Sequence, residues 1–208
     1  MIRIDKETIY ESHGYTFRNV VTLNHAEKLK ILMWRNSKQV RSVMVNKGII
    51  SEHDHLVFIE GLNNREDCYY WLVANRDGED VGVLDLLHVD ENKDVGELGY
   101  YMDPSFVGMG LEFVLECEFF VYHVLQLGNN VATVSVNNKA ALLLNTYLGD
   151  TYEGVEEIDG ESYFFNKHAN GHYLIQHYQE FNLNDYFAYW KAHKDIVKEI
   201  IESITASK

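Results

Sequence analysis

The sequence is poor in cysteine, proline and basic residues, and each shortage narrows the class of protein. Its only cysteines are Cys68 and Cys117, and its only proline is Pro104. The cysteine spacing matches no zinc or redox motif, so we expect two core side chains and a reducing, cytoplasmic location. No apolar run reaches the roughly 20 residues that cross a bilayer, and residues 1–15 lack a signal-peptide pattern. We therefore expect no membrane partner.

The shortage of positive charge limits the possible ligands further. The 18 Lys and Arg residues are outnumbered by 32 Asp and Glu residues, which leaves a formal net charge of −14. Such a surface repels polyanions, so nucleic acid is not expected as a partner. Any anionic ligand must be held by local donors. The 46% of hydrophobic residues suffice for one sizeable core, which predicts one domain with an appendage.

Hydrophobic periodicity predicts an α/β domain of the α+β type over residues 1–167 and a helical extension over residues 168–208. The expected order is β-αα-β-β-β-α-β-α-β. The predicted strands cover residues 16–23, 69–75, 81–89, 97–102, 131–136 and 161–167. The predicted helices cover residues 25–36, 52–61, 108–127 and 138–148. Within the helix over residues 52–61, the side chains expected to face the core are Leu56 and Ile59, with Phe58 as a further candidate.

The most informative stretch lies between a predicted strand and the longest predicted helix. It reads ELGYYMDPSFVGMGLEFVLECEFF over residues 97–120 and carries Gly108 and Gly110 just before the helix. Glycines let main-chain N–H groups approach a phosphate, and the helix N-terminus adds a partial positive charge. This pattern favours a pyrophosphate site without basic side chains. A tight turn that needs its glycines only for backbone geometry is the alternative.

A second stretch, NNKAALLLNTYLGDTYEG over residues 137–154, follows the next predicted strand. By itself it predicts a capped core helix that ends at Gly149. Together the two stretches resemble the GNAT superfamily, in which the phosphate loop is followed by a strand and a pattern of the form N-x-x-A-x-x-L-Y-x-x-x-G-F. The matching positions are Asn138, Ala141, Leu144, Asn145, Gly149 and Asp150.

The GNAT resemblance implies a mixed, mostly antiparallel central sheet that is flanked by helices and splays at its middle strand. The splay admits the pantetheine arm of acetyl-CoA, the expected cosubstrate. By this resemblance, the residues that bind acetyl-CoA are Tyr100, Met102, Phe106, Val107, Gly108, Met109, Gly110, Leu111 and Asn138. Ser105 stands where many such loops carry Gln or Arg, but phosphate binding there depends chiefly on backbone amides.

The N-terminal half resembles the PseH group of the superfamily, N-acetyltransferases that act on a UDP-linked 4-amino-4,6-dideoxy sugar. The segments that carry this resemblance are EKLKILMWRN at 27–36, VRSVM at 40–44 and IISEHDHLVFIEGL at 49–62. It implies a nucleotide-sugar pocket lined by Arg35, Met44, His55 and Phe58, with Arg35 or Arg41 near the UDP phosphates. The local excess of positive charge that suits a diphosphate consists of Arg35, Lys38, Arg41 and Lys47. For Lys38 and Lys47, complementing a helix dipole is the alternative.

The residue that should act as the general acid departs from the superfamily pattern. Asn145 occupies the position of the tyrosine that protonates the departing CoA thiolate, and an amide cannot supply that proton. Tyr147, Tyr101 or a water molecule would have to act instead. A thiolate with a reference pKa of about 8.5 is already a fair leaving group, so the reaction does not depend wholly on an acid.

The candidate base for the acceptor amine is Glu97, or His88 through a water molecule. Glu97 is also compatible with a simple exposed strand position. Main-chain N–H groups around residues 98–101 are expected to polarise the thioester carbonyl. His53 and His55 lack a carboxylate-rich set of partners, so no metal site is predicted.

The sequence thus predicts an acetyl-CoA-dependent N-acetyltransferase that acts on the amine of a UDP-linked amino sugar for surface polysaccharide or flagellin glycan synthesis. A protein N-terminus or another small amine is an alternative acceptor. A non-catalytic GNAT-like binding module, which lost its chemistry with the tyrosine at position 145, is the alternative from another class. From Asn184 onward the pattern predicts one amphipathic helix, in which Phe187, Trp190 and Ile200 suggest a homodimer contact.

Overall fold

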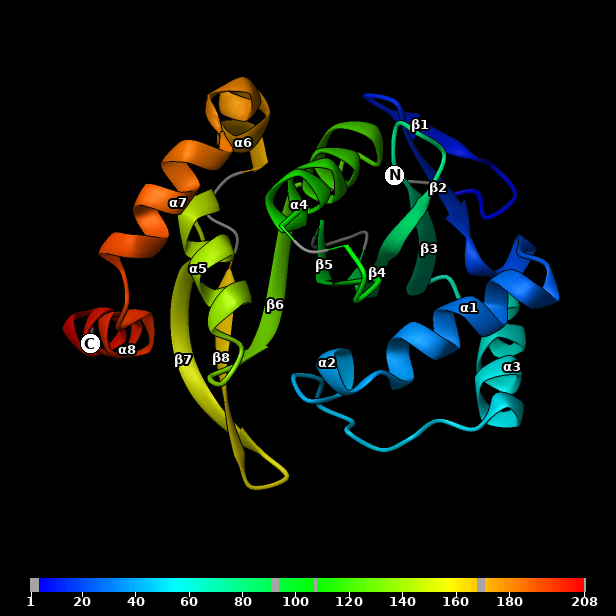
Figure 1. The fold of residues 1–208 in the computed structure, drawn as a ribbon, viewed down its shortest axis with the longest axis horizontal. Helices are drawn as coiled ribbons and strands as arrows, with labels where there is room; N and C mark the ends of the chain where they lie inside the picture. The colour runs from blue at the N-terminus through cyan, green and yellow to red at the C-terminus, as the bar shows by residue number, and fades with distance from the viewer. Residues whose placement is uncertain (1–3, 91–93, 107, 168–170, 208) are drawn as a thin grey trace.

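A computed structural model of the chain describes residues 4–90, 94–106, 108–167 and 171–207. Its centre is one eight-stranded sheet with the strand order β1-β2-β3-β4-β5-β6-β8-β7, in which only the β5–β6 pair is parallel (Figure 1). The strands are β1 (Tyr10–Ser12), β2 (Tyr15–Asn19), β3 (Cys68–Ala74), β4 (Asp80–Asp90), β5 (Val95–Met102), β6 (Asn129–Ser135), β7 (Thr151–Ile158) and β8 (Glu161–Lys167). The helices are α1 (His25–Asn36), α2 (Lys38–Arg41), α3 (Glu52–Gly61), α4 (Gly110–Phe119), α5 (Lys139–Leu148), α6 (Gly171–His177), α7 (Leu183–Ala192) and α8 (Ile196–Ala206). The predicted fold class, a mixed and mostly antiparallel sheet flanked by helices, is confirmed.

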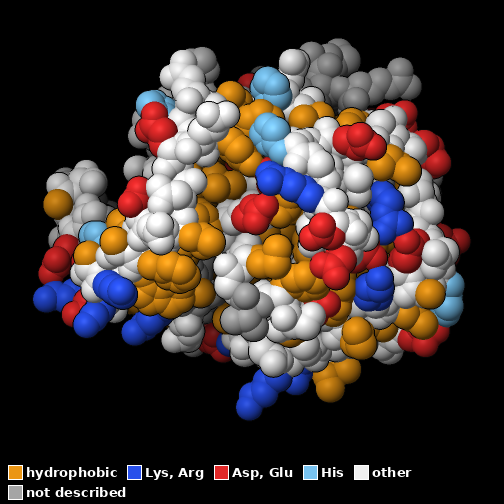
Figure 2. All heavy atoms as spheres, turned by 45° about the horizontal axis from the view of Figure 1, so that its top comes forward, with side chains coloured by type: hydrophobic (Ala, Val, Ile, Leu, Met, Phe, Trp, Pro, Cys, Tyr) orange, Lys and Arg blue, Asp and Glu red, His pale blue; other side chains and the backbone are white. Residues whose placement is uncertain are grey.

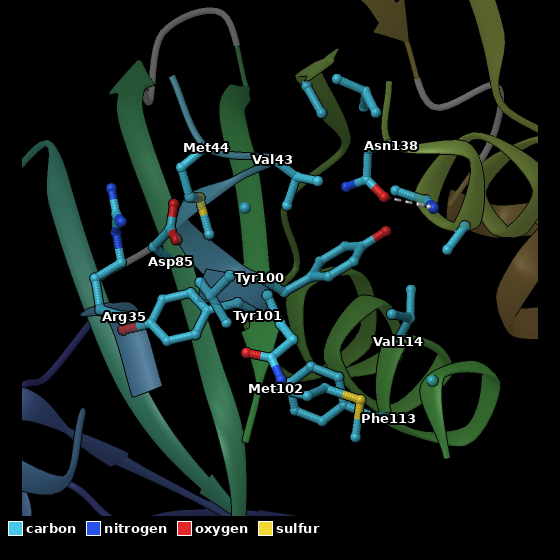
Figure 3. Close-up of a pocket in the computed structure, with 18 of the residues that line it drawn as sticks. Arg35, Val43, Met44, Asp85, Tyr100, Tyr101, Met102, Phe113, Val114 and Asn138 are labelled. Atoms are coloured by element: carbon cyan, nitrogen blue, oxygen red, sulfur yellow. Dashed lines mark hydrogen bonds between the residues drawn. The ribbon is translucent and has the colours of Figure 1, made fainter. Parts of the chain in front are cut away.

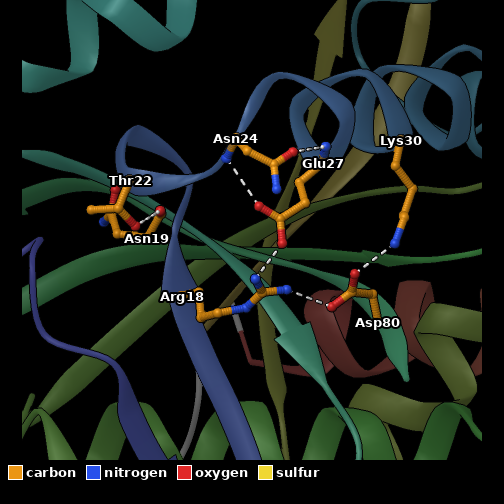
Figure 4. Close-up of polar contacts among 7 residues, drawn as sticks. All are labelled: Arg18, Asn19, Thr22, Asn24, Glu27, Lys30 and Asp80. Carbon is orange, nitrogen blue, oxygen red and sulfur yellow. Dashed lines mark hydrogen bonds and ion pairs between the residues drawn. The ribbon is translucent and has the colours of Figure 1, made fainter. Parts of the chain in front are cut away.

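The start of α1 is fixed by a polar network that reaches two strands (Figure 4). Asn24 caps the helix, because its Oδ1 accepts from the Glu27 N–H at 3.0 Å while Glu27 accepts from the Asn24 N–H at 2.9 Å. Glu27 also accepts a hydrogen bond from Arg18 on β2, and Arg18 donates to Asp80 on β4 at 2.7 Å. Lys30 donates to the other oxygen of Asp80 at 2.7 Å. The N-terminal half of the helix is therefore tied to β2 and β4.

Two hydrophobic clusters cover opposite faces of the N-terminal half of the sheet. Along β3, Trp71 and Val73 belong to the cluster under α4, whereas Leu72 belongs to the cluster under α1 and α3. This alternation follows from the two-residue period of a strand. Cys68 and Cys117 are free and buried, one in each cluster, so the prediction that both cysteines fill the core is confirmed.

Helix α4 is shorter than the predicted helix over residues 108–127. It ends at Phe119 and continues as one π-helical turn, in which the Leu125 N–H donates to the Phe120 carbonyl at 2.9 Å. The wider turn buries three successive side chains, those of Phe120, Val121 and Tyr122. The regular helix is interrupted after Phe119, but burial continues through the π turn, which explains why the hydrophobic pattern predicted one longer helix.

Helix α3 buries a narrower face than predicted. Its buried residues are His55 and Ile59, while Leu56 is half-buried and Phe58 is 43% exposed. Residues four positions apart lie on one stripe of a helix, so a histidine takes the place expected for an apolar residue. The expectation that Phe58 faces the core is wrong; it lies edge-on to Tyr70 with the ring centroids 5.3 Å apart.

Two edge strands, β1 and β7, escaped prediction. β1 returns into β2 through a two-residue turn at His13 and Gly14, both with positive φ, 47° and 85°. β7 buries only Tyr152 among its eight residues, because it lies at the edge of the sheet beside β8. The predicted first strand over residues 16–23 ends early, at Asn19, where the chain enters a 3-10 turn.

The C-terminal residues add three helices to the sheet domain. α6 contacts α4, α7 contacts α5, and α8 contacts α5 and β7. α7 and α8 replace the single helix expected from Asn184, and the break falls at residues 193–195. Ile196, Ile200 and Ile204 of α8 are buried in a third cluster with α5 and β8. No helix in the described part of the chain is long and apolar enough to cross a membrane.

Candidate active site

The sheet opens between β5 and β6. The two strands pair in parallel only through Val95–Asn129, Gly96–Asn130 and Glu97–Val131. β5 continues to Met102 and β6 to Ser135, and over these residues the described chain forms no further β5–β6 pair. β5 stays paired to β4 up to Met102, so the edge of β5 that faces β6 is left open. The predicted splay at the middle strand is therefore present.

A cavity of about 1120 Å³ fills this opening and is lined by both halves of the sheet. Tyr100 and Tyr101 are neighbours on β5 and point to opposite sides of it (Figure 3). Tyr100 points toward α4 and α5, whereas Tyr101 lies on the side of Arg35 and Asp85. We call the part beside Tyr100, where acetyl-CoA is expected, the donor side. We call the part beside Tyr101, Arg35 and Asp85, where the acceptor amine is expected, the acceptor side.

On the donor side, seven predicted acetyl-CoA contacts line the cavity, namely Tyr100, Met102, Phe106, Gly108, Gly110, Leu111 and Asn138. Gly108 has a φ of 88°, and a Cβ added to Gly108 or Gly110 would meet no atom within 4 Å. No side-chain hydrogen bond caps α4 at Met109, which does not itself line the cavity. Open backbone at a helix start suits an anion such as a pyrophosphate. Val107 lies outside the described residues.

The hydroxyl of Tyr100 donates a hydrogen bond to Asn145 Oδ1, and its ring lies edge-on to Phe113. Asn145, at the position of the superfamily tyrosine, is thus a positioning partner of a phenol that comes from β5. Burial raises the pKa of Tyr100 well above its ordinary value, which keeps the phenol protonated. A protonated hydroxyl is consequently present on the donor side even though position 145 is an amide.

The two tyrosines considered as replacement acids lie in different places. Tyr101 lines the cavity on its acceptor side, and burial raises its pKa. Tyr147 does not line it; its ring packs on Phe181, Tyr186 and Tyr189, and its hydroxyl donates to the Asn182 carbonyl at 3.4 Å. Tyr147 therefore anchors α7 to α5 instead of facing the opening.

On the acceptor side, the structure brings Arg35, Met44, His55 and Phe58 together on the cavity wall. Arg35 donates from Nη2 to the Asn46 carbonyl at 2.7 Å. Its Nη1 is buried and has no hydrogen-bond partner among the described residues. Burial lowers the pKa of Arg35, which nevertheless stays charged because a guanidinium titrates so high. One charged donor on this side of the cavity is therefore left without a partner among the described residues.

Arg41 and His55 do not supply positive charge to the cavity wall. Arg41 does not line the cavity; it donates to the carbonyls of Asn36 at 3.1 Å and Lys47 at 2.9 Å, which holds the loop after α2. His55 Nε2 lies 2.9 Å from the Lys28 carbonyl. Burial lowers the pKa of His55, so it is neutral near pH 7 and adds no positive charge to the wall.

Glu97 lines the cavity at the last β5–β6 pair, and its side chain is 31% exposed. His88 Nε2 lies 3.7 Å from Glu97 Oε2, but the His88 side chain is 72% exposed and does not line the cavity. The two candidate bases thus lie next to each other at the point where the strands part.

Asp85 is a site residue that the sequence reading missed. It lies on β4 directly opposite Gly99 of β5 and lines the acceptor side beside Arg35. Burial, and then the nearby Glu97, raises the pKa of Asp85 to about 7, while Arg35 opposes this shift. The one signal in the sequence is Gly99 itself, because a glycine inside a strand often marks a close approach.

Helix α7 also lines the cavity, through Leu183, Tyr186, Phe187 and Trp190. Leu183, Phe187 and Trp190 are 47%, 49% and 43% exposed. Figure 2 shows hydrophobic side chains gathered on the left of the view, the side of the molecule that carries the C-terminal helices in Figure 1. Of the three residues expected at a dimer contact, Ile200 is buried in the core of its own chain. Homodimer formation stays a prediction.

A mixed sheet that parts at one parallel strand pair, with a glycine-led helix start beside the gap, has the architecture of an acyl-CoA-dependent acyltransferase. Residues 15–149 match the family model described as the acetyltransferase (GNAT) domain, and the chain belongs to that family. It is therefore an acetyltransferase with acetyl-CoA as its cosubstrate, as the sequence predicted. No curated protein matches the chain.

Two solved structures share the fold at low sequence identity. Spermidine N-acetyltransferase from Vibrio cholerae, in complex with CoA and spermine, has a TM-score of 0.64 and 17% identity, covering 75% of this chain and 94% of its own. The N-acetyltransferase PseH from Campylobacter jejuni, in complex with acetyl coenzyme A, has a TM-score of 0.57 and 24% identity, covering 73% of this chain and 96% of its own. At these identities the likeness concerns the fold.

Proposed function

We propose that the enzyme transfers the acetyl group of acetyl-CoA to the amine of a UDP-linked amino sugar. The observation that carries this proposal is the buried, unpartnered Nη1 of Arg35 on the acceptor side. A buried charged donor without a partner is unfavourable unless a ligand completes it. A phosphate oxygen of a nucleotide sugar is such a partner, and guanidinium groups bind phosphate well.

The other walls of the acceptor side fit the rest of a nucleotide sugar. Met44, Phe58, Tyr70 and Tyr101 supply apolar and aromatic surface beside Arg35. Such surfaces accept the flat face of a base or the C–H face of a deoxy sugar. The resemblance of residues 27–62 to the PseH group points to the same class of acceptor.

The proposed reaction is a direct attack of the neutral amine on the thioester carbonyl. Main-chain N–H groups on the open edge of β5 beyond Glu97 are available to polarise that carbonyl, because β6 diverges from β5 after that residue. The start of α4 around Gly108 and Gly110 holds the pyrophosphate of the donor. No covalent enzyme intermediate is required.

A polyamine is the second candidate acceptor. Four carboxyl groups line the cavity, those of Asp54, Asp85, Glu97 and Asp103, and the chain carries a net charge of −14. Carboxylates attract a polycation, whereas Arg35 repels it. The Nη1 of Arg35, which has no partner among the described residues, is the reason why the nucleotide sugar is preferred.

The test measures CoA release with acetyl-CoA and either a panel of UDP-4-amino-4,6-dideoxy sugars or spermidine. We expect turnover with a member of the UDP-sugar panel. We also expect Arg35→Gln to raise the KM for that sugar by about tenfold or more, because one lost charge-assisted bond is worth roughly 1.5–3 kcal/mol. Lys38→Gln is the matched control, because Lys38 is exposed and lies outside the cavity lining.

Turnover of spermidine alone would replace the nucleotide sugar with the polyamine. Binding of acetyl-CoA without release of CoA, across the UDP-sugar panel and spermidine, would favour the non-catalytic module. An Arg35→Gln variant with an unchanged KM for the UDP sugar would remove the phosphate contact from the proposal.

A further inference from the structure

The carboxyl group of Asp85 lies across the neighbouring strand at the cavity. Asp85 is paired with Gly99, two residues beyond the last β5–β6 pair at Glu97. A Cβ built on Gly99 would lie 2.5 Å from Asp85 Oδ1 and 2.9 Å from its Cγ. Only glycine leaves room for a carboxyl group over the backbone there. The two residues together place an acid at the acceptor face of the opening.

The surroundings of Asp85 leave its carboxyl group available for proton transfer. The titratable and charged groups near it are Arg35 of α1, Cys68 and Tyr70 of β3, and Glu97 and Tyr101 of β5, while Cys117 of α4 lies across the sheet. Desolvation and two charges, Glu97 and Arg35, determine its titration, and no hydrogen bond from a described residue contributes. A carboxyl group with a pKa near 7 is half ionised at neutral pH, which suits a general base.

We infer that Asp85 is the catalytic base that takes the proton from the acceptor amine. The competing candidates are less well placed, because His88 is largely exposed and Glu97 lies where the strands are still paired. The inference rests on the proposed acetylation of an amine, but it does not depend on whether that amine belongs to a sugar or a polyamine.

The proposed step is a proton transfer to Asp85 followed by acyl transfer. The acceptor binds as an ammonium ion, and the Asp85 carboxylate removes one N–H proton. The freed electron pair attacks the thioester carbonyl carbon, so that a C–N bond forms and the C–S bond breaks. The second N–H proton, lost as the amide forms, neutralises the CoA thiolate. Asp85 then returns its proton to water.

The experiment compares kcat/KM from about pH 5 to about pH 9 for the wild type and the variants Asp85→Asn, Asp85→Glu and Glu97→Gln. The acceptor is the UDP-4-amino sugar or spermidine, whichever is turned over. We expect the wild-type value to fall about tenfold per pH unit below pH 7, and Asp85→Asn to lose roughly 10²–10⁴-fold at pH 8 together with this dependence. Asp85→Glu should restore part of the rate, and Glu97→Gln should keep the acid limb but move it to lower pH, because Glu97 raises the pKa of Asp85.

An Asp85→Asn variant within threefold of wild type, or one that keeps the acid limb, would overturn the inference. If neither amine is turned over, the proposed acceptors fail but Asp85 can still be tested by a ¹³C NMR titration of the aspartate carboxyl carbons. A signal that titrates near pH 7 in the wild type and is absent from Asp85→Asn supports the role. The absence of such a signal from the wild type overturns it.

Discussion

At the scale of single residues, Asp85 links the chemistry of the site to the stability of the fold. A buried acid with a raised pKa favours the protonated folded chain, whereas the unfolded chain releases the proton at the ordinary value. The folded pKa is about 7 against a reference of 3.8. Between these values the folded chain holds a proton that the unfolded chain has lost, so stability falls as the pH rises through this window.

We therefore expect Asp85→Asn to unfold at a higher temperature than the wild type at pH 8 and at a similar temperature near pH 4. A shift of this size corresponds to at most about 4 kcal/mol at neutral pH. Thermal melts across this pH range measure the effect. Asp77→Asn, in the exposed β3–β4 turn, is the control and should follow the wild type. A constant offset between wild type and Asp85→Asn at every pH would contradict the expectation.

The candidate site could be read from the sequence where a residue type and a spacing recur together. The segments at 27–36 and 49–62 point to Arg35 and His55, which line the acceptor side. Asp85 was not predicted as a site residue, because the sequence DLLHVD at 85–90 has the pattern of an ordinary strand. Only the pairing of β4 with β5 brings its carboxyl group over Gly99. The partnership of Tyr100 with Asn145 joins two segments 45 residues apart, which no local pattern can reveal.

At the scale of elements, the C-terminal ends of α3 and α5 show how a glycine at a helix end can differ in conformation. Gly149 follows α5 with a φ of 103°, as the sequence predicted for a helix cap. Gly61 is the last residue of α3, but it keeps a helical φ of −60° and the chain runs on into a 3-10 turn. The two glycines therefore impose different backbone requirements at similar sites.

Replacement by alanine should separate these roles. Gly149→Ala should destabilise the protein by about 1 kcal/mol, because a left-handed backbone is unfavourable for a residue with a Cβ. Gly61→Ala should stabilise it by roughly 0.5–1 kcal/mol, because a Cβ there meets no atom within 4 Å and alanine favours the helix. Urea unfolding midpoints measure both changes. The expectation is wrong if the two midpoints move in the same direction.

Most internal elements were predictable, because their hydrophobic patterns are strong. The β3–β4 hairpin, the capped helices α1 and α5, and the strand before α4 all follow from local signals. The edge strands β1 and β7 and the split between α7 and α8 were not, since their positions depend on what lies against them. The π turn after Phe119 likewise follows from packing against the sheet.

At the scale of the whole molecule, the sheet consists of two parts that, among the residues the structure describes, are joined by three residue pairs between β5 and β6. Acetyl-CoA, bound in the gap, should therefore stabilise the protein as a unit. At a concentration 100 times its Kd, the expected gain is about 2.7 kcal/mol. Thermal melts with acetyl-CoA or with acetate at the same concentration measure it. An equal rise in both samples would contradict specific binding.

The open edge of β5 has a consequence for the catalytic cycle. The backbone amides of residues 98–102 that face away from β4 have no β6 partner in the described chain. A pantetheine arm carries amide groups of its own, so a bound donor can complete the hydrogen bonding that the polypeptide leaves unfinished. Binding of acetyl-CoA would then connect β5 to β6 in each catalytic cycle, and release of CoA would remove this connection. Product release and the loss of rigidity in the sheet would therefore occur together.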